Sequence, residues 1–168
     1  DWGWLKRVKN RLWARAGPSR DKASLIRSSR DLFELGLDLM NEASGIKCRY
    51  NPWQAEVQFR DGLLIAILAS RPVRLKNLTS IEIGRHLIRI DNIYWLVFEA
   101  PEVKNQRHIE VPLPEALAPY INGYLADHRP HLLQGNTSAR LWISRFGGNL
   151  TCNSVRRQIK LHTEAAFG

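Results

Sequence analysis

The sequence contains few cysteines and no long apolar run, and each absence excludes a class of protein. Its two cysteines, Cys48 and Cys152, are too far apart in sequence to form a clustered metal site or a disulfide framework. The longest unbroken apolar stretch, Leu63–Ala69, is far shorter than the ~20 residues that span a bilayer. The first residues carry lysine and arginine where a signal peptide has its apolar centre. We therefore expect a reducing, cytoplasmic setting and no membrane partner.

Acidic residues are scarce beside basic ones. The 168 residues include 25 Lys and Arg against 16 Asp and Glu, which gives a formal net charge of +9. The excess is concentrated in residues 1–30, whereas residues 31–70 carry a net negative charge. This imbalance favours a polyanion such as nucleic acid as the partner. The basic excess has two other interpretations. It can form a solvated charged face, and the amphipathic residues 2–15 can bind a membrane surface.

Hydrophobic periodicity predicts helices on both sides of a strand-rich middle. Leucines recur near a 3.6-residue period over roughly residues 20–41. An apolar helix from Pro52 to about Ser70 has Asn51 as its candidate cap. Arg71-Pro72 ends this helix, because a residue before proline is pushed out of the helical region. Further helices are predicted over residues 2–15, from residue 114 until Arg129-Pro130, and over residues 151–166.

The middle of the chain predicts a small antiparallel sheet. Residues 86–91, 93–99 and 107–113 are rich in β-branched and aromatic side chains, and short polar turns separate them. In the third segment Ile109 and Val111 alternate with polar neighbours, as in a half-buried strand. Three such strands in a row indicate a meander with residues 102–106 as one hairpin turn. The predicted fold class is α+β, mostly helical with a three-stranded antiparallel meander.

Two motifs occur in order on these elements. Residues 60–78 (RDGLLIAILASRPVRLKNL) form an apolar helix, a tight turn, Arg74 and then the packing residues Leu75 and Leu78. Residues 103–114 (VKNQRHIEVPLP) place Lys104 in a hairpin before a basic, apolar, Val-Pro-Leu strand. Together they resemble the first conserved box and the hairpin lysine of the tyrosine recombinases (phage integrase family). The resemblance covers about residues 20–168.

The resemblance implies a domain organisation and a reaction. Residues 20–168 are similar to the N-terminal part of the catalytic domain, and residues 1–19, with the breaker Gly17-Pro18-Ser19, to the end of a core-binding domain plus linker. Because Asp1 stands where methionine would begin a protein, we expect a piece of a longer chain. The family's reaction is attack of a tyrosine oxygen on a DNA phosphodiester, which leaves a 3′-phosphotyrosyl link and a free 5′-hydroxyl.

The residue types suit that chemistry. Arg74 would meet the non-bridging phosphate oxygens with two parallel, permanently charged hydrogen bonds. Lys104 would protonate the departing 5′ oxygen as general acid. Because a covalent nucleophile divides the reaction into two reversible steps, the resemblance implies no cofactor, neither nucleotide nor metal.

The first box departs from the family pattern around its arginine. Pro72-Val73 stand where the family commonly has Thr-Gly, and Asn77 stands where it has a glutamate. Asn77 can hydrogen-bond but brings no negative charge to hold Arg74. Arg71 is a competing candidate for the catalytic arginine, although it lies early relative to the packing leucines.

The family's second box, His-x-x-Arg followed by the nucleophilic tyrosine, has no match. His86-Leu87-Ile88-Arg89 fits the letters but lies in strand-like sequence, where positions i and i+3 face opposite sides. His162-Thr163-Glu164-Ala165 lacks the arginine. We interpret all four tyrosines, Tyr50, Tyr94, Tyr120 and Tyr124, as structural, with the case for Tyr50 the weakest.

The resemblance implies double-stranded DNA as partner and other recombinase protomers around the intact protein. Phosphate contacts of lysine and arginine give affinity without sequence choice. The candidates for such contacts are Lys6, Arg7, Lys9, Arg11, Arg20, Lys76, Arg85, Arg156, Arg157 and Lys160.

Three functions stay open. The first is a part of a site-specific recombinase or integrase of a mobile element, in which this segment alone binds DNA without cleaving it. The second is a non-catalytic DNA-binding or assembly module with a relic recombinase fold. The third is a basic α+β domain with no nucleic-acid role.

Overall fold

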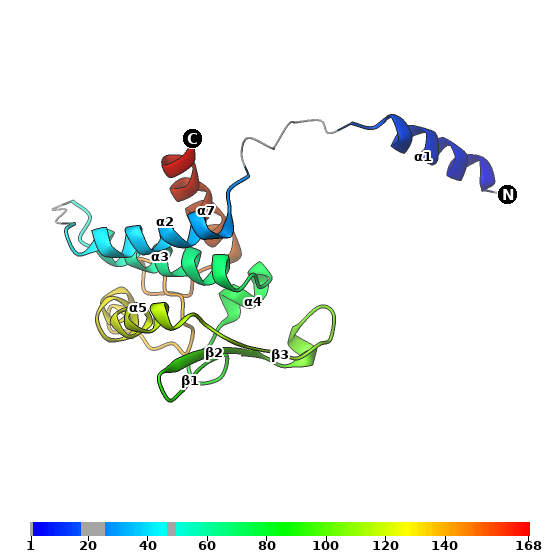
Figure 1. Ribbon diagram of the computed structural model, residues 1–168. Coiled ribbons are helices and arrows are strands. Elements are labelled where there is room, and N and C mark those ends of the chain that lie inside the picture. The colour runs from blue at the N-terminus through cyan, green and yellow to red at the C-terminus, as the bar shows by residue number, and fades with distance from the viewer. Residues whose placement is uncertain (1, 18–25, 47–49) are drawn as a thin grey trace.

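The first described helix stands by itself. The computed structural model describes residues 2–17, 26–46 and 50–168, and α1 (Gly3–Arg15) lies apart from the other helices in Figure 1. The predicted helix over residues 2–15 is confirmed, and none of its residues is buried. Of the breaker Gly17-Pro18-Ser19, only Gly17 is among the described residues.

Two helices, α2 (Ser29–Ala43) and α3 (Gln54–Ser70), pack closely against each other. Their backbones meet at two glycines: a Cβ added at Gly36 would lie 2.7 Å from the Gly62 carbonyl oxygen, and one added at Gly62 would lie 2.6 Å from that of Gly36. The side chains from Phe59 to Ile67 are all buried, which explains why α3 is apolar nearly all round.

Both helix starts differ from the prediction. α2 begins at Ser29, because the Ser28 hydroxyl accepts the Asp31 amide and the Asp31 carboxylate accepts the Ser28 amide, a reciprocal cap. The sequence predicts a helix from about residue 20, whereas α2 begins only at Ser29. Residues 18–25 lie outside the described ranges. Asn51 as cap of α3 is wrong: the helix starts two residues later than expected, and Trp53 precedes it without a side-chain cap.

The short helix α4 (Leu75–Ser80) follows α3 after an extended turn. The predicted end of α3 at Arg71-Pro72 is confirmed. Leu78 is fully buried, and its carbonyl accepts the indole N–H of the equally buried Trp142 at 2.9 Å. The apolar segment around Trp142 thus fixes α4 to the core.

The predicted meander is confirmed. Strands β1 (Leu87–Ile90), β2 (Ile93–Phe98) and β3 (Ile109–Pro112) form one antiparallel sheet in the order β1-β2-β3. Ile90 faces Ile93 across the first turn, and Phe98 faces Ile109 across the second. The 3₁₀ turn η2 (Ala100–Glu102) opens the loop between β2 and β3. The fold is α+β, as expected.

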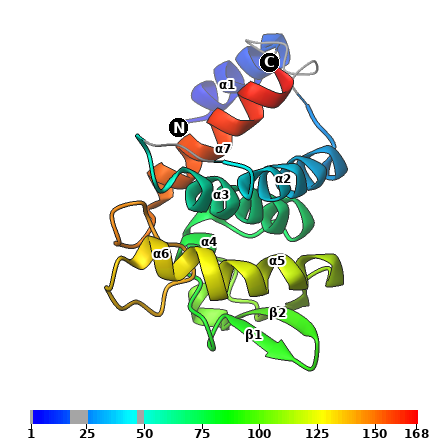
Figure 2. The same ribbon diagram turned by 90° about the vertical axis from the view of Figure 1, so that its left-hand side faces the viewer.

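A series of short helical segments packs on the side of α3 that faces away from α2 (Figure 2). These are η3 (Glu115–Leu117), α5 (Ala118–Gly123), the π turn η4 (Tyr124–His128) and α6 (Arg129–Leu133). The predicted helix end before Arg129-Pro130 is wrong. A wider π turn precedes the proline, which has no N–H and would clash with the carbonyl of an ordinary α turn, so the helical path continues to Leu133.

The predicted last helix is confirmed as α7 (Cys152–Phe167), and Thr151 caps it through a bond from the Ser154 amide to the threonine hydroxyl. Arg60 and Asp61, adjacent in α3, form a buried ion pair at 2.6 Å, and His162 of α7 contacts the second Asp61 oxygen at 3.3 Å, which joins α7 to the core. None of the helices in the described ranges has both the length and the apolarity that a membrane crossing needs.

Candidate functional site

Arg74 stands at the start of α4 with its side chain exposed. No hydrogen bond or ion pair from it to another described residue is present. The competing candidate, Arg71, is used inside the protein: its Nε donates to the Pro112 carbonyl at 2.8 Å and its Nη1 to the Ser70 carbonyl at 2.9 Å. Arg71 ties the end of α3 to the end of β3, which leaves Arg74 as the free guanidinium of this turn.

Lys104 lies in the loop between β2 and β3, two residues after η2. Its side chain is exposed, and it too lacks a hydrogen-bond or ion-pair partner among the residues that the structure describes. Arg74 and Lys104 line the same hollow of about 450 Å³, to which Lys76 adds a third cation. The lining residues are Arg74, Lys76, Asn77, Pro101, Glu102, Val103, Lys104 and Gln106. We call this space the basic hollow.

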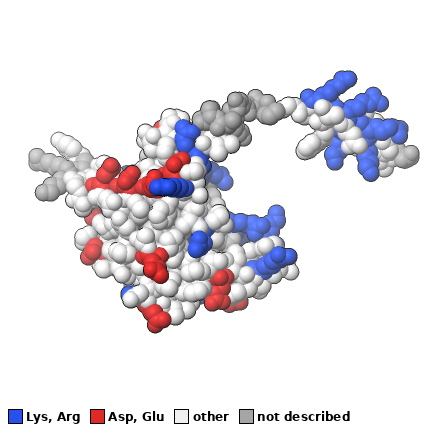
Figure 3. All heavy atoms as spheres, viewed as in Figure 1, with Lys and Arg blue, Asp and Glu red and all other residues white. Residues whose placement is uncertain are grey.

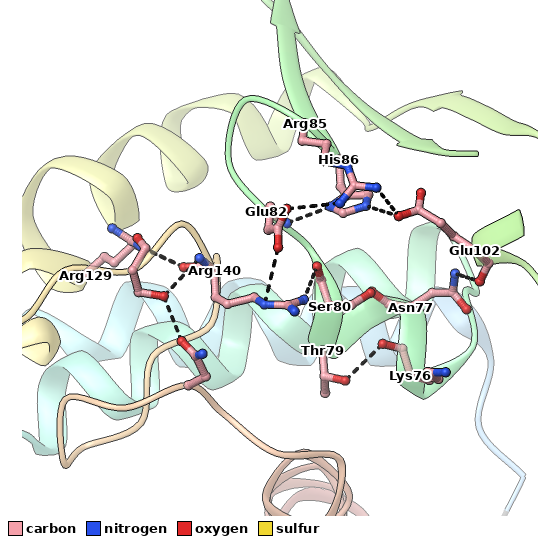
Figure 4. A network of polar contacts seen from close by, with 12 residues as sticks. Lys76, Asn77, Thr79, Ser80, Glu82, Arg85, His86, Glu102, Arg129 and Arg140 are labelled. Atoms are coloured by element: carbon pink, nitrogen blue, oxygen red, sulfur yellow. Dashed lines mark hydrogen bonds and ion pairs between the residues drawn. The ribbon is translucent and has the colours of Figure 1, made fainter.

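One carboxylate, Glu102, borders the basic hollow and is held by neighbours outside it (Figure 4). Its Oε1 accepts hydrogen bonds from Arg85 Nη2 at 2.6 Å and from His86 Nε2 at 3.1 Å. Its backbone carbonyl accepts the Asn77 amide at 3.1 Å. The hydrogen bond from His86 lowers the pKa of Glu102, and Arg85 lowers it further. The carboxylate is therefore already partnered, and the three cations dominate the hollow.

The buried ring of His86 has a defined tautomer. Its Nδ1 accepts the Glu82 amide at 3.0 Å, so the proton of the neutral ring lies on Nε2 and points to Glu102. Arg89, three residues on, donates to the Asp91 carbonyl and to Asn92 at the β1–β2 turn. These two side chains do not converge, as expected for a His-x-x-Arg sequence in a strand.

Charge is unevenly distributed over the surface. Figure 3 shows basic side chains gathered on the side of the body that carries α4 and the β2–β3 loop, and acidic ones along α2. The acidic residues of α2 recur every three or four positions and are all exposed: Asp31, Glu34, Asp38 and Glu42. An anion is thus attracted to the side of the basic hollow and repelled from α2.

The other candidate phosphate contacts are spread over several elements. Lys6, Arg7, Lys9 and Arg11 are exposed on α1, and Arg20 lies outside the described residues. Arg85 is exposed but pairs with Glu82 and Glu102. Arg156, Arg157 and Lys160 are exposed on α7, where Lys160 pairs with Glu164 at 3.4 Å. Of the nine that the structure describes, only Lys76 lines the basic hollow.

Arg157 belongs to a second hollow, between α7 and the turn at residues 144–148. Arg145 also lines it, with its guanidinium 4.6 Å from the ring centroid of the exposed Phe146. Sequence reasoning missed Arg145, although the Ser-Arg-Phe-Gly-Gly run around it has the composition of a surface turn.

Three of the four tyrosines are bonded internally. Tyr124 is fully buried and donates to the Leu141 carbonyl at 3.1 Å, and burial raises the pKa of its hydroxyl. Tyr94 donates to Asn122 and Tyr120 to Asn41. Tyr50 is 94% exposed and lies at the edge of a described range. The structural interpretation thus fits the first three.

The residues that sequence reasoning missed at the site are Glu102, His86 and Gln106. Glu102 and His86 are 16 positions apart and meet only because β1 and β2 pair. Gln106 lines the hollow from a left-handed backbone conformation, with φ of 51°. The reciprocal Glu99–Glu102 cap of η2 is a local pattern that could mark Glu102, whereas its contact with His86 and the place of Gln106 arise from tertiary structure.

The arrangement suits a phosphate group. Three cations border an open hollow whose one carboxylate is engaged elsewhere, and guanidinium and ammonium groups are the side chains that bind phosphate oxygens. The described residues contain no group of three or more His, Cys, Asp or Glu that could hold a metal ion. A scan of the sequence against protein-family models finds no match, and a search of curated proteins finds none either.

Proposed function

We propose that this chain binds double-stranded DNA with Arg74 and Lys104 on one phosphate of the backbone, as the N-terminal part of a recombinase or integrase catalytic domain. The observation that carries the proposal is that these two cations, 30 positions apart, line one hollow while neither side chain has a hydrogen-bond or ion-pair partner among the described residues. Free cations on one open surface are available to an external anion.

In the intact protein the two residues would have different tasks. A tyrosine oxygen attacks the phosphorus, its hydroxyl proton passes to a base of the intact protein, and the bond from phosphorus to the 5′ oxygen breaks. Arg74 neutralises the charge that builds on the non-bridging oxygens, and the Lys104 ammonium gives its proton to the departing 5′ oxygen. The reverse step returns that proton to Lys104. The tyrosine and the His-x-x-Arg pair would come from a further part of the intact protein.

A second candidate is a non-catalytic DNA-binding or assembly module. It is favoured by the tyrosines, because Tyr94, Tyr120 and Tyr124 all use their hydroxyls inside the fold. In such a module the same cations bind DNA, but no covalent intermediate forms. Trapping of phosphotyrosyl DNA by the complete gene product separates the two candidates.

DNA binding itself is tested with this chain, by fluorescence anisotropy of a labelled duplex. Arg74→Ala and Lys104→Ala should each weaken binding about three- to tenfold and lower the salt slope by about 1. The matched control is Arg30→Ala, which removes a positive charge from the acidic side of the body, where Arg30 pairs with Glu34. Equal losses in all three variants would show that the hollow has no special role.

Catalysis is tested by trapping the covalent intermediate. The complete gene product should form a phosphotyrosyl link to DNA, and the Arg74→Ala or Lys104→Ala form of it should not. The present segment alone should form none. A covalent link formed by the segment alone, or full activity of either variant, would contradict the recombinase function.

A further inference from the structure

The loop that carries Lys104 is anchored at Glu102. Within the loop, the Glu99 amide donates to the second carboxylate oxygen, Oε2, at 3.0 Å. From outside the loop, His86 donates to Oε1 and Asn77 to the backbone carbonyl. Glu102 therefore accepts bonds from the loop itself, from the entry to β1 and from α4.

These contacts connect Lys104 to Arg74. Arg74 immediately precedes α4, and Asn77 belongs to the first turn of that helix. Asn77 is 6% exposed, so its amide is held within the fold where it meets the Glu102 carbonyl. The bond fixes the start of α4 against the start of the Lys104 loop. Neither cation's side chain is bonded to the other network members, so their relative position depends on this contact and on the bonds to the Glu102 carboxylate that hold the loop.

His86 gives the anchor a rigid support. The ring is 3% exposed, and its centroid lies 5.1 Å from that of Phe98 at the end of β2. Because Nδ1 is occupied by the Glu82 amide, the Nε2–H has one direction, toward Glu102. The same Glu102 oxygen also accepts the exposed Arg85 guanidinium at 2.6 Å, so a fixed buried donor and an exposed charged one hold the carboxylate together.

We propose that Glu102, held by His86 and Asn77, is a positioning residue that sets Lys104 across the hollow from Arg74. This inference rests on the proposed function of the hollow. It makes a counterintuitive prediction, because Glu102 is an acidic residue beside a site for an anion. Removal of its charge alone should favour DNA, whereas removal of its hydrogen-bond acceptors should weaken DNA binding.

The test compares Glu102→Ala with Glu102→Gln in the full chain, again with a labelled duplex. The glutamine keeps one oxygen acceptor for His86 and Arg85 and gives up the bond from the Glu99 amide, so the bonds from outside the loop remain and binding should be unchanged or stronger. The alanine should weaken binding by at least about threefold, and this loss should vanish in a Lys104→Ala background. The control Glu110→Ala removes an exposed carboxylate from β3, outside the network, and should not weaken binding. Equal or stronger binding by Glu102→Ala would overturn the proposal.

Hydrogen exchange gives a second readout that does not depend on DNA. The Gln106 amide is bonded to the Val103 carbonyl at 2.8 Å, within the same loop, and its exchange should accelerate in Glu102→Ala but not in Glu102→Gln. Unchanged exchange would overturn the proposal. A different result would separate the two proposals: faster exchange in Glu102→Ala combined with full DNA binding by Lys104→Ala. It would refute the proposed function of Lys104 and, with it, the role of Glu102 in DNA binding. If Glu102→Ala unfolds, Asn77→Ser removes one anchoring donor and is measured in its place.

Discussion

Arg71 and Arg74 show how residues of one type, three positions apart, can have separate roles. Arg71 is partly buried and donates to two backbone carbonyls, so it belongs to the structure of the turn. Arg74 is exposed and lacks such bonds to described residues. The sequence favours Arg74 because of the leucines behind it, and the contacts of Arg71 give an independent reason for that choice.

We predict that Arg71→Ala lowers the free energy of unfolding by about 1.5–3 kcal/mol, because hydrogen bonds from a charged donor to two backbone carbonyls disappear. Arg74→Ala should change it by less than about 0.5 kcal/mol, as expected of an exposed side chain. Urea denaturation measures both values. A reversed order would mean that the assignment of the two arginines is wrong.

His128 introduces a pH dependence of stability. Burial lowers its pKa below the ordinary 6.5, and its ring stacks on Phe59 with centroids 3.9 Å apart. A group whose pKa is lower in the folded than in the unfolded state contributes its full stabilisation of the folded state above the unfolded pKa. This contribution is lost as the pH falls through the folded-state pKa. The thermal midpoint should therefore fall as pH drops below 6.5.

The matching variant is His128→Phe, which keeps an aromatic ring on Phe59 without a titrating group. Its midpoint should depend less on pH across the same range than that of the unchanged chain. Parallel pH profiles of the two proteins would show that another group causes the effect.

At the scale of elements, the close approach of α2 and α3 depends on Gly36 and Gly62. A methyl group at Gly36 would lie 2.7 Å from a backbone oxygen and 2.8 Å from the Ala66 Cβ, neither of which can move easily. We predict that Gly36→Ala lowers the free energy of unfolding by about 1–3 kcal/mol. The control is Gly123→Ala in α5, where the nearest atom is 3.8 Å away and alanine should be neutral or stabilising. Similar effects at both positions would contradict this view of the packing.

The elements also show what a sequence can predict. The end of α3 at a proline, the three strands and the last helix after Gly147-Gly148 follow from local stereochemistry, and these predictions are confirmed. The predicted start of α2 is wrong, because leucine periodicity does not mark a helix end, whereas the reciprocal Ser28–Asp31 cap does. The continuation of the helix past Pro130 could not be predicted from the sequence. It depends on a π turn, which departs from ordinary helix geometry and keeps the segment packed on α3.

In the candidate site, too, some residues can be predicted from the sequence and others cannot. Arg74 and Lys104 can be proposed from the sequence because each lies on a motif, and in the structure both line one hollow. The Glu102–His86 contact could not be found, because it joins residues whose proximity depends on strand pairing and on the β2–β3 loop. Arg145 beside Arg157 is a similar case, since the turn at 144–148 and α7 meet only in the folded chain.

At the scale of the whole molecule, the basic charge is divided between α1 and the body. None of the residues of α1 is buried, so residues 1–17 should contribute little to the stability of the rest. We predict that a variant without them keeps its thermal midpoint but binds duplex DNA more weakly, with a salt slope reduced by about 0.9 for each phosphate that α1 neutralises. A large drop in the midpoint would show that α1 packs on the body, and unchanged DNA affinity would remove it from the binding surface.

The central claim is that Arg74 and Lys104 hold the same phosphate, and a double-mutant cycle tests it most directly. Duplex affinity is measured for the unchanged chain, Arg74→Ala, Lys104→Ala and the double variant. Residues that share one partner are coupled, so the double variant should lose at least about threefold less affinity than the product of the single losses. Independent, multiplying losses, or no loss in either single variant, would contradict the account.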